Sequence, residues 1–406
     1  MARPDVVVAG HICLDITPLF AEKRSLPLEH VLIPGKLTLM EGVEISPGGA
    51  VSNTGLALAR LGYSTALVGK CGDDALAGLL EETLEARGGK ARLTRTKESR
   101  TSYSVILAPP ATDRIFLHDP GANDTFAAAD LDLSVLQGAR LLHFGYPPVM
   151  RVLYENDGAE LEALLEGAQE AGVAVSLDMA LPDPDSEAGR LDWESIIRRI
   201  APWVDIFLPS FEELALMLDR PLFEELVERA GHGDMVDVVT PDELGRLGDR
   251  LTEFEIPIGG IKFGHRGFYL RTGKGERLSA LCKKLSLNVE AWRRRELFSE
   301  SFEVEDLASA TGAGDASIGG FLAALLDHRQ PEGALTLACA AGAQICRRYD
   351  AQSGLESLVS VDAAIESGWR RHRSEAFAGR FRYQEDKSIW VGPADSGFDT
   401  YPTTPA

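Results

Sequence analysis

The chain has 406 residues, of which 45% are hydrophobic and 25% are charged, so it can bury a sizeable core and is not disordered as a whole. Its 62 acidic residues outnumber its 41 basic ones, which gives a formal net charge of −21. A surface of this charge repels phosphate backbones and anionic lipids. We therefore expect neither nucleic acid nor a membrane as a main partner.

The five cysteines are scattered along the chain and form no CxxC pair. This usage is typical of a reducing compartment and argues against disulfides or a cysteine zinc site. The eight histidines are too scattered to indicate a metal motif. The first residues show no basic region followed by a long apolar one, so we expect no signal peptide and a cytoplasmic protein.

Short apolar segments alternate with helical patterns along the chain. We expect buried strands at residues 6–9, 141–144, 173–177, 204–208 and 256–263. We expect helices at residues 52–61, 74–86, 158–171, 193–200, 212–218, 241–254, 313–326 and 331–347. Apolar strands that alternate with helices are typical of a mostly parallel sheet covered on both faces. The predicted fold is a three-layer, doubly wound α/β fold.

Two segments interrupt this alternation, at residues 19–45 and 92–118. They contain strand-like stretches with no helix between them, and we expect them to form a small β lid outside the main sheet. Residues 384–406 are rich in Asp, Gly, Pro and Thr and lack periodicity, which is typical of a loosely docked tail. We therefore predict one domain over residues 1–380, with the lid inserted in it, and a C-terminal tail over residues 381–406.

The strongest local pattern is Thr311-Gly312-Ala313-Gly314-Asp315, which precedes an apolar helix. Glycines at a helix start let backbone N–H groups approach an anion closely. A carboxylate at that place repels phosphate, but it can take the proton of a hydroxyl that attacks a phosphoryl group. An ordinary loop-to-helix junction, with Asp315 as a first-turn acid, explains these residues equally well.

A second glycine pair, Gly48-Gly49, opens the helix expected at residues 52–61 and is followed by Asn53. The glycines allow a small polar ligand to approach, and the Asn amide can both donate to and accept from a hydroxyl. Taken alone, this pattern is better explained by a capped surface helix.

Three weaker patterns complete the candidate set. Lys262, Gly264 and Gly267 lie on a strand, a tight turn and a second strand, a hairpin that can lie against a nucleotide. Glu213 stands in the first turn of a helix, where a capping box is a sufficient explanation. Asp15 follows the first strand, at the end of the sheet where open α/β folds bind ligands.

Other nucleotide-binding and hydrolytic motifs are excluded. A dinucleotide fingerprint requires GxGxxG, but Gly312 and Gly314 are followed by Ser317 at the third glycine position. The sequence contains neither a GxxxxGK[ST] P-loop nor a GxSxG elbow.

Taken in order, these segments resemble the ribokinase-like (PfkB-type) carbohydrate kinase family. The resemblance extends from Val6 to about Gly368. It is carried by Gly48-Gly49, Asn53, Ala59-Arg60-Leu61-Gly62, Pro120-Gly121-Ala122-Asn123, Lys262-Phe263-Gly264, Thr311-Gly312-Ala313-Gly314-Asp315 and Gly320-Phe321-Leu322. Two glycine signatures in the family's order and spacing are far more specific than either one alone.

The resemblance implies ATP-dependent, Mg²⁺-assisted phosphorylation of a hydroxyl of a sugar or sugar-like small molecule. By matching positions, Asp315 is the implied general base, and the anion hole is formed by the amides of Gly312, Ala313 and Gly314. The implied contacts to the acceptor come from Asp15, Gly48, Gly49 and Asn53. Those to ATP come from Lys262, Gly264, Gly267 and Thr311. Glu213 is implied on the Mg²⁺ side, acting through water.

The resemblance also assigns a role to the lid. Its closure over the sugar would exclude water, which otherwise competes as the acceptor, and the lid is the expected contact of a homodimer.

Two departures from the family's pattern affect the ions. The family's Asn-x-x-Glu is replaced by Ser210-Phe211-Glu212-Glu213, which shortens one polar ligand of the metal–water network. The Asp-Thr that usually precedes the glycines is replaced by Ser309-Ala310. Because that Asp helps to bind an activating monovalent cation in relatives, we expect K⁺ to matter less here.

Two alternatives stay open at this point. One is a nucleoside kinase of the same fold, and the other is a sensor that binds sugar or nucleotide without turnover. The retained Asp315 beside its glycines favours an active kinase. The residues do not specify which sugar or nucleoside is the acceptor.

Overall fold

The computed structural model of the chain describes residues 3–21, 28–109, 115–348, 350–373 and 377–398. Its main sheet has eleven strands in the order β14-β15-β13-β12-β11-β10-β9-β8-β1-β4-β5. These are Val6–Gly10 (β1), Thr65–Gly72 (β4), Lys90–Thr96 (β5), Leu141–Gly145 (β8), Ala174–Asp178 (β9), Ile206–Phe207 (β10), Ile258–Phe263 (β11), Gly267–Thr272 (β12), Glu296–Glu300 (β13), Arg382–Gln384 (β14) and Ile389–Val391 (β15). Neighbouring strands are parallel from β5 to β11, and antiparallel pairing from β11 to β14 completes the sheet.

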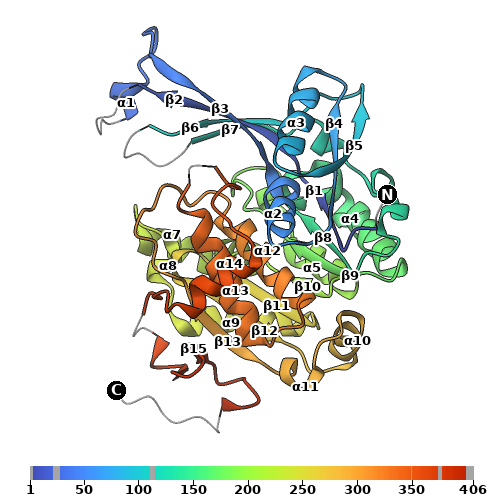
Figure 1. Cartoon of the computed structure of the whole chain (residues 1–406), viewed down its shortest axis with the longest axis vertical. Helices are drawn as coiled ribbons and strands as arrows, with labels where there is room; N and C mark the ends of the chain where they lie inside the picture. The colour runs from blue at the N-terminus through green and yellow to red at the C-terminus, as the bar shows by residue number, and fades with distance from the viewer. Residues whose placement is uncertain (1–2, 22–27, 110–114, 349, 374–376, 399–406) are drawn as a thin grey trace.

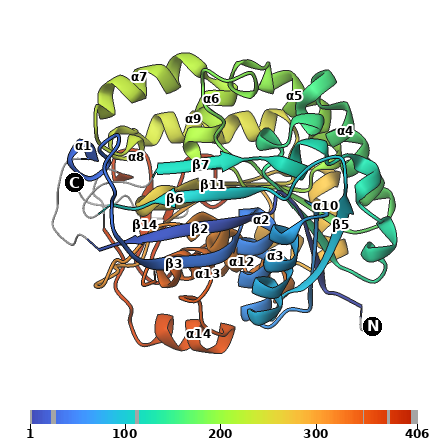
Figure 2. The same ribbon diagram turned by 90° about the horizontal axis from the view of Figure 1, so that it is seen from above.

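Helices cover both faces of this sheet, apart from the first helix of the chain, which lies at the lid (Figures 1 and 2). They are Leu28–Val31 (α1), Gly49–Arg60 (α2), Ala75–Ala86 (α3), Arg151–Glu170 (α4), Trp193–Ile200 (α5), Phe211–Leu218 (α6), Arg220–Ala230 (α7), Met235–Val238 (α8), Pro241–Glu253 (α9), Glu276–Leu285 (α10), Val289–Trp292 (α11), Ala313–Leu326 (α12), Pro331–Ile345 (α13) and Leu358–Glu366 (α14).

The alternation of β1 side chains explains the layers. Val7 and Ala9 pack into one hydrophobic core with α4, α5, α6 and α9. Val6 and Val8 point to the opposite face and pack into a second core with α2, α10, α12 and α13. Because successive strand residues face opposite sides, an uninterrupted apolar strand needs a cover on both. The predicted α/β fold is thereby confirmed.

A second sheet of four strands forms the lid. Its order is β3-β2-β6-β7, with strands Cys13–Phe20 (β2), Met40–Gly48 (β3), Tyr103–Leu107 (β6) and Ile115–Asp119 (β7). It projects from the upper part of the molecule in Figure 1, and in Figure 2 it lies across the main sheet. The predicted lid is confirmed as a separate small sheet.

The lid boundaries differ from those expected. The lid begins at Cys13 rather than at residue 19. Residues 92–96 belong to β5, which pairs in parallel with β4 in the main sheet. Alternating exposure along β5 makes it look like a lid strand in sequence, because an edge strand also has one solvated face.

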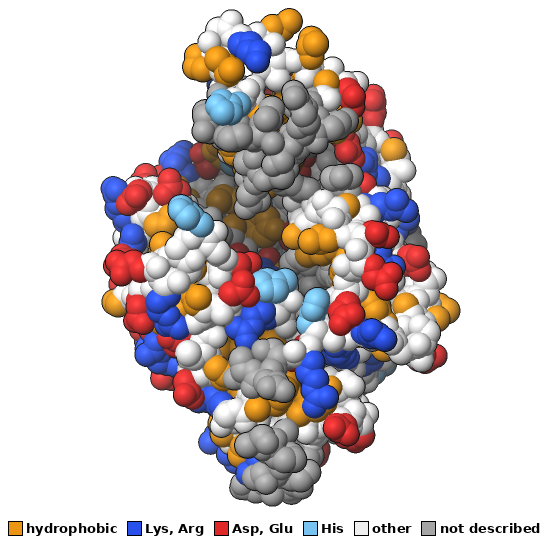
Figure 3. Space-filling model, turned by 90° about the vertical axis from the view of Figure 1, so that its left-hand side faces the viewer, with side chains coloured by type: hydrophobic (Ala, Val, Ile, Leu, Met, Phe, Trp, Pro, Cys, Tyr) orange, Lys and Arg blue, Asp and Glu red, His pale blue; other side chains and the backbone are white. Residues whose placement is uncertain are grey.

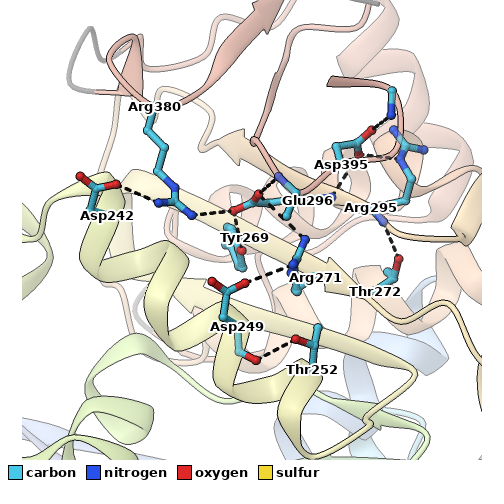
Figure 4. A network of polar contacts seen from close by, with 12 residues as sticks. Asp242, Asp249, Thr252, Tyr269, Arg271, Thr272, Arg295, Glu296, Arg380 and Asp395 are labelled. Carbon is cyan, nitrogen blue, oxygen red and sulfur yellow. Dashed lines mark hydrogen bonds and ion pairs between the residues drawn. The ribbon is translucent and has the colours of Figure 1, made fainter. Parts of the chain in front are cut away.

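The C-terminal segment is docked, and more firmly than the loosely docked tail that the sequence leads us to expect. β15 pairs with β13, and Trp390 is buried. The carboxylate of Asp395 accepts from Arg295 Nε at 2.8 Å, and Glu296 accepts from the backbone N–H of Ala394 at 2.7 Å (Figure 4). The polar residues of this segment therefore find partners inside the fold rather than in water. Residues 399–406 of the predicted tail lie outside the described residues.

All five cysteines are buried and free. Within the described ranges, the structure has no helix with both the length and the hydropathy of a membrane span.

Candidate active site

Asp315 lies in the first turn of α12 and is 4% exposed. Gly312 precedes the helix with φ +77, and a Cβ there would lie 2.5 Å from the side chain of Ala351, so only glycine fits. Among the described residues, no side chain caps this helix N-terminus. The N–H of Ala313, one of the three amides expected in the anion hole, donates to Ala310 O at 3.1 Å. The other N–H groups of the first turn and the helix dipole can receive an anion.

The two glycine signatures meet in space. Asn53 Nδ2 of α2 donates to Asp315 Oδ2 at 3.0 Å, and Thr54 Oγ1 donates to Asp315 Oδ1 at 3.3 Å. The helices can come this close because Gly319 of α12 packs against α2, where a Cβ would lie 2.8 Å from Ala57 Cβ.

A third donor to Asp315 comes from Tyr146, which the sequence analysis missed. Tyr146 Oη lies 2.8 Å from Oδ1 and 2.9 Å from Oδ2 of Asp315. It directly follows β8, so it lies at the carboxyl end of a central strand, where ligands bind in open α/β sheets. That position was the only signal available, because no motif marks it.

Burial and hydrogen bonds act on Asp315 in opposite directions. Burial raises the pKa of its carboxyl group. The hydrogen bond from Asn53, the charge of Lys262 and the hydrogen bonds from Tyr146 and Thr54 lower that pKa, and the net shift is upward. A carboxylate with a raised pKa is a better proton acceptor than an exposed one.

Lys262 is the cation of the site. Its ammonium forms a hydrogen-bonded ion pair with Asp178 and lies 3.8 Å from Glu213 Oε2. Burial lowers the pKa of Lys262, but the charges of Asp178 and Glu213 outweigh that effect and raise it, so the ammonium stays charged. A Cβ on Gly314 would touch Lys262 Cδ at 3.4 Å, which places the lysine beside the glycine loop.

Asp178 is the second residue that sequence analysis missed. It ends β9, is fully buried, and its Oδ2 has no hydrogen-bond partner in the described part of the chain. Glu213 forms the expected capping box, in which its carboxylate accepts from the N–H of Ser210 at 2.6 Å.

The acceptor-side residues lie where the lid joins the main sheet. Asp15 of β2 lies against Gly48, where a Cβ would come within 2.2 Å of its carboxylate. Gly49 has φ +83 and lies against His11. His11 Nε2 is 3.2 Å from Nε2 of His118, on lid strand β7. Burial, together with the charge of His118, lowers the pKa of His11 to about 3, so the His11 ring is neutral. The contact between His11 and His118 therefore links the lid to the main sheet through a neutral His11.

The remaining nucleotide-side candidates are more weakly tied to the site. Gly264 and Gly267 lie in the turn between β11 and β12, with φ +51 and +137. A Cβ on Gly267 would lie 2.0 Å from Ser299 O, so strand packing is enough to explain that glycine. Thr311 adjoins Gly312, and its N–H donates to Ser309 Oγ at 3.0 Å.

The side of the molecule seen in Figure 3 is hollowed beneath the lid, with hydrophobic side chains inside the hollow. A separate cavity of about 700 Å³ lies beyond the start of β11 and the end of β12, lined by residues such as Pro257 and Lys274. It shares no residue with the Asp315 site. Among the residues that the structure describes, no group of three or more His, Cys, Asp or Glu could hold a metal ion.

A family model decides the assignment. The model described as "pfkB family carbohydrate kinase" matches residues 4–245 and 287–358. The chain belongs to this family. As a pfkB carbohydrate kinase it is a phosphotransferase, which confirms the resemblance found in the sequence.

Individual relatives of this pfkB kinase are distant. An uncharacterized sugar kinase of Archaeoglobus fulgidus is 26% identical over 304 residues, which cover 75% of this chain and all of that protein. A fructokinase of Solanum tuberosum is 32% identical over 148 residues, 35% of this chain and 46% of the relative. The structure of Arabidopsis thaliana ribokinase complexed with ribose and ATP is 20% identical, with a TM-score of 0.65 over 90% of this chain and 99% of that one.

Proposed function

We propose that the protein transfers the γ-phosphoryl group of ATP to a hydroxyl of a sugar or sugar-like polyol. The observation that carries this proposal is the position of Asp315. Its buried carboxylate lies at the N-terminus of α12, where the described residues provide no side-chain cap, with Asn53 Nδ2 at 3.0 Å from Oδ2 and the charge of Lys262 acting on it. A proton acceptor, an anion hole and a cation beside it are what transfer to a hydroxyl requires.

In this mechanism Asp315 takes the proton of the acceptor hydroxyl while the hydroxyl oxygen attacks the γ-phosphorus. The bond between that phosphorus and the ADP oxygen breaks, and the sugar phosphate and ADP leave. The amides of Gly312 and Gly314 hold the transferring group, together with the ammonium of Lys262. The proton that Asp315 has gained returns to solvent.

The acceptor is held by Asp15, Gly48, Gly49 and Asn53, whose glycines let a small ligand approach the backbone. The nucleotide lies along Lys262, Gly264, Gly267 and Thr311. These assignments are carried over from the family resemblance by matching positions.

Mg²⁺ would enter this site bound to the phosphates of the nucleotide. The described residues offer no three-ligand cluster, and Mg²⁺ typically binds through substrate phosphates, water and one or two carboxylates. Glu213, which lies next to Lys262, would hold its water shell, and Asp178 has a free oxygen in the same cluster. When bound, the ion neutralises charge on the phosphates.

We also propose that two copies associate through their lids. The edge strands of the lid sheet are β3 and β7. Exposed apolar side chains lie on them and near them: Leu39, Met40, Val43, Phe116 and Leu117. Apolar groups on open strand edges favour pairing with another chain. Sedimentation of the wild type and of Val43→Glu checks this, with a dimer expected only for the wild type.

ADP release measured over a panel of sugars, polyols and nucleosides tests the main proposal. We expect turnover with at least one sugar or polyol and none without Mg²⁺. Turnover with nucleosides only would favour the nucleoside kinase alternative. Binding of sugar and ATP without turnover would favour the sensor.

A further inference from the structure

Tyr146 is the one contact to Asp315 that no sequence motif accounts for. Its hydroxyl lies almost equally far from the two carboxylate oxygens, at 2.8 and 2.9 Å. Burial and the charges of Asp315 and Asp178 raise the pKa of Tyr146 well above its usual value. The phenol therefore keeps its proton and donates a hydrogen bond to Asp315.

The donors on the carboxylate of Asp315 leave little room for another one. A carboxylate offers about four lone-pair sites. Thr54 donates to Oδ1 and Asn53 to Oδ2, while the single O–H of Tyr146 lies between the two oxygens and blocks the side that they share. Asp315 is 4% exposed, so an acceptor hydroxyl, which must donate to Asp315 before it loses its proton, competes with these donors for its oxygens.

The backbone indicates which donor moves. Tyr146 has φ 70 and ψ 39, the left-handed conformation that bulky residues rarely adopt. Asn53 and Thr54 lie inside α2 and are fixed by its hydrogen bonds. Tyr146 lies between the end of β8 and a short 3₁₀ turn, Pro147–Val149. Strained residues of this kind cluster at sites that change state.

We propose that, in the free enzyme, the Tyr146 hydroxyl occupies the position at Asp315 that the acceptor hydroxyl takes in the complex. When the acceptor binds, the Tyr146 hydroxyl moves away from one oxygen of Asp315. This inference rests on the proposed function, because it assumes that Asp315 receives the acceptor's proton. Tyr146 is a positioning residue in this scheme. Before a sugar enters, its hydroxyl keeps water away from the base, and so it limits wasteful hydrolysis of ATP.

Several other groups face this pair. The positive charge of Lys262, on β11, acts on Asp315. The negative charges of Asp178, on β9, and Glu213, on α6, act on Tyr146. The ring of His11 lies 6.1 Å from that of Tyr146. Among the described residues, the donors to the Asp315 side chain are Tyr146, Asn53 and Thr54, so removing the phenol hydroxyl takes away one of the three.

The substitution Tyr146→Phe removes the hydroxyl and keeps the ring. ADP release without acceptor should rise by roughly fivefold or more, the size of one hydrogen bond, and the acceptor KM should fall by a similar factor. The acidic limb of the kcat/KM profile should move up by about one pH unit, since the lost hydrogen bond had favoured the charged carboxylate. Tyr63→Phe is the matched control, because Tyr63 Oη donates to Ala323 O on the same helix, away from Asp315.

Carbon-13 NMR titration of Asp315, assigned with Asp315→Asn, provides a readout that needs no activity. We expect a higher pKa for Asp315 in Tyr146→Phe than in the wild type or in Tyr63→Phe. An unchanged titration overturns the proposal, even if no acceptor in the panel supports turnover and the proposed function itself fails. A shifted titration with unchanged acceptor KM and unchanged acceptor-free hydrolysis overturns the displacement step.

Discussion

Asn53 and Asp315 are 262 positions apart in the chain, yet their side chains are hydrogen-bonded. Each belongs to a helix that begins at a glycine with positive φ, and the two helices pack closely through Gly319. Asn53 also accepts from Gln352 Nε2 at 2.7 Å, which fixes its amide orientation with Nδ2 toward Asp315. The Nδ2 group has two N–H donors, and the second is the one that the proposed acceptor would use.

We expect Asn53→Ala to weaken acceptor binding more than ATP binding. Loss of one buried hydrogen-bond partner costs about 1–3 kcal/mol, which corresponds to roughly a five- to hundredfold rise in the acceptor dissociation constant. Calorimetric titrations with the acceptor and with ATP separate the two effects. Asn288→Ala, which removes the cap of α11, serves as the control. Weaker ATP binding with unchanged acceptor binding would reverse the assignment.

At the scale of single residues, sequence analysis finds the functional residues that belong to recurring motifs. Asp315, Asn53 and Lys262 belong to such motifs, and the structure brings all three together. Tyr146 and Asp178 could not be found in this way. Tyr146 follows the buried strand β8 and Asp178 ends the buried strand β9. The importance of each depends on contacts with residues more than 80 positions away.

At the scale of single elements, strand β8 carries a buried histidine. His143 is fully buried, and its Nδ1 lies 3.0 Å from Ser176 Oγ on β9. Burial, with the charge of Lys262, lowers the pKa of His143 to about 3. Its unfolded pKa is about 6.5, so between these values the unfolded chain binds a proton that the folded chain does not.

The free energy of unfolding should therefore fall as the pH drops from 6.5 toward 3. The slope contributed by one such histidine is at most about 1.4 kcal/mol per pH unit. Urea unfolding at several pH values gives the slope of the free energy of unfolding against pH. This slope should be smaller for His143→Asn than for the wild type. The substitution His232→Asn, at an exposed position, should leave the slope unchanged. Equal slopes in all three proteins would contradict this account.

The loop before α12 leads to a prediction about monovalent cations. Ser309 provides a neutral hydroxyl where relatives have a carboxylate, and that hydroxyl already accepts from the N–H of Thr311. Mg²⁺ should be required, but K⁺ should stimulate turnover only weakly. Turnover with Mg²⁺ held constant and K⁺ replaced by a bulky organic cation measures the effect. A large, saturable stimulation by K⁺ would show that other oxygens compensate.

Element boundaries were harder to predict than element types. α4 begins at Arg151 rather than near residue 158, because the chain leaves helical geometry at residues 155–158 and then resumes it. The pattern of apolar residues is lost across such a break. The sequence places residues 92–96 of β5 in the lid for a similar reason, because a strand at the edge of the main sheet has the same exposure pattern as a lid strand.

At the scale of the whole molecule, the C-terminal segment completes the main sheet. Buried Glu296 accepts from Tyr269 Oη at 3.0 Å and from the N–H of Ala394, and Arg380 lies 3.5 Å away (Figure 4). Asp395 pairs with Arg295, which also binds Glu332. Composition alone could not predict this docking, because the same polar residues would suit a solvated tail. We propose that residues up to 398 form one folding unit with the kinase.

Asp395→Ala should lower the free energy of unfolding by about 3 kcal/mol, the low end for breaking a buried ion pair, because Arg295 keeps Glu332 as a partner. Urea unfolding monitored by tryptophan fluorescence reports the loss, since Trp390 is in the same segment. Asp386→Ala, at an exposed position, is the control. A loss below the effect of the control would mean that the segment adds nothing to the stability of the fold.

The measurement that tests the central claim most directly compares Asp315→Asn with the wild type, both for turnover and for binding. The amide keeps the shape of the side chain but cannot take a proton, so acceptor-dependent ADP release should fall by about 10²–10⁴-fold. Calorimetry should show ATP and acceptor affinities close to those of the wild type. Asp327→Asn, at the other end of α12, should keep full turnover. Near-normal turnover by Asp315→Asn would contradict the account, because the general base would then be another group.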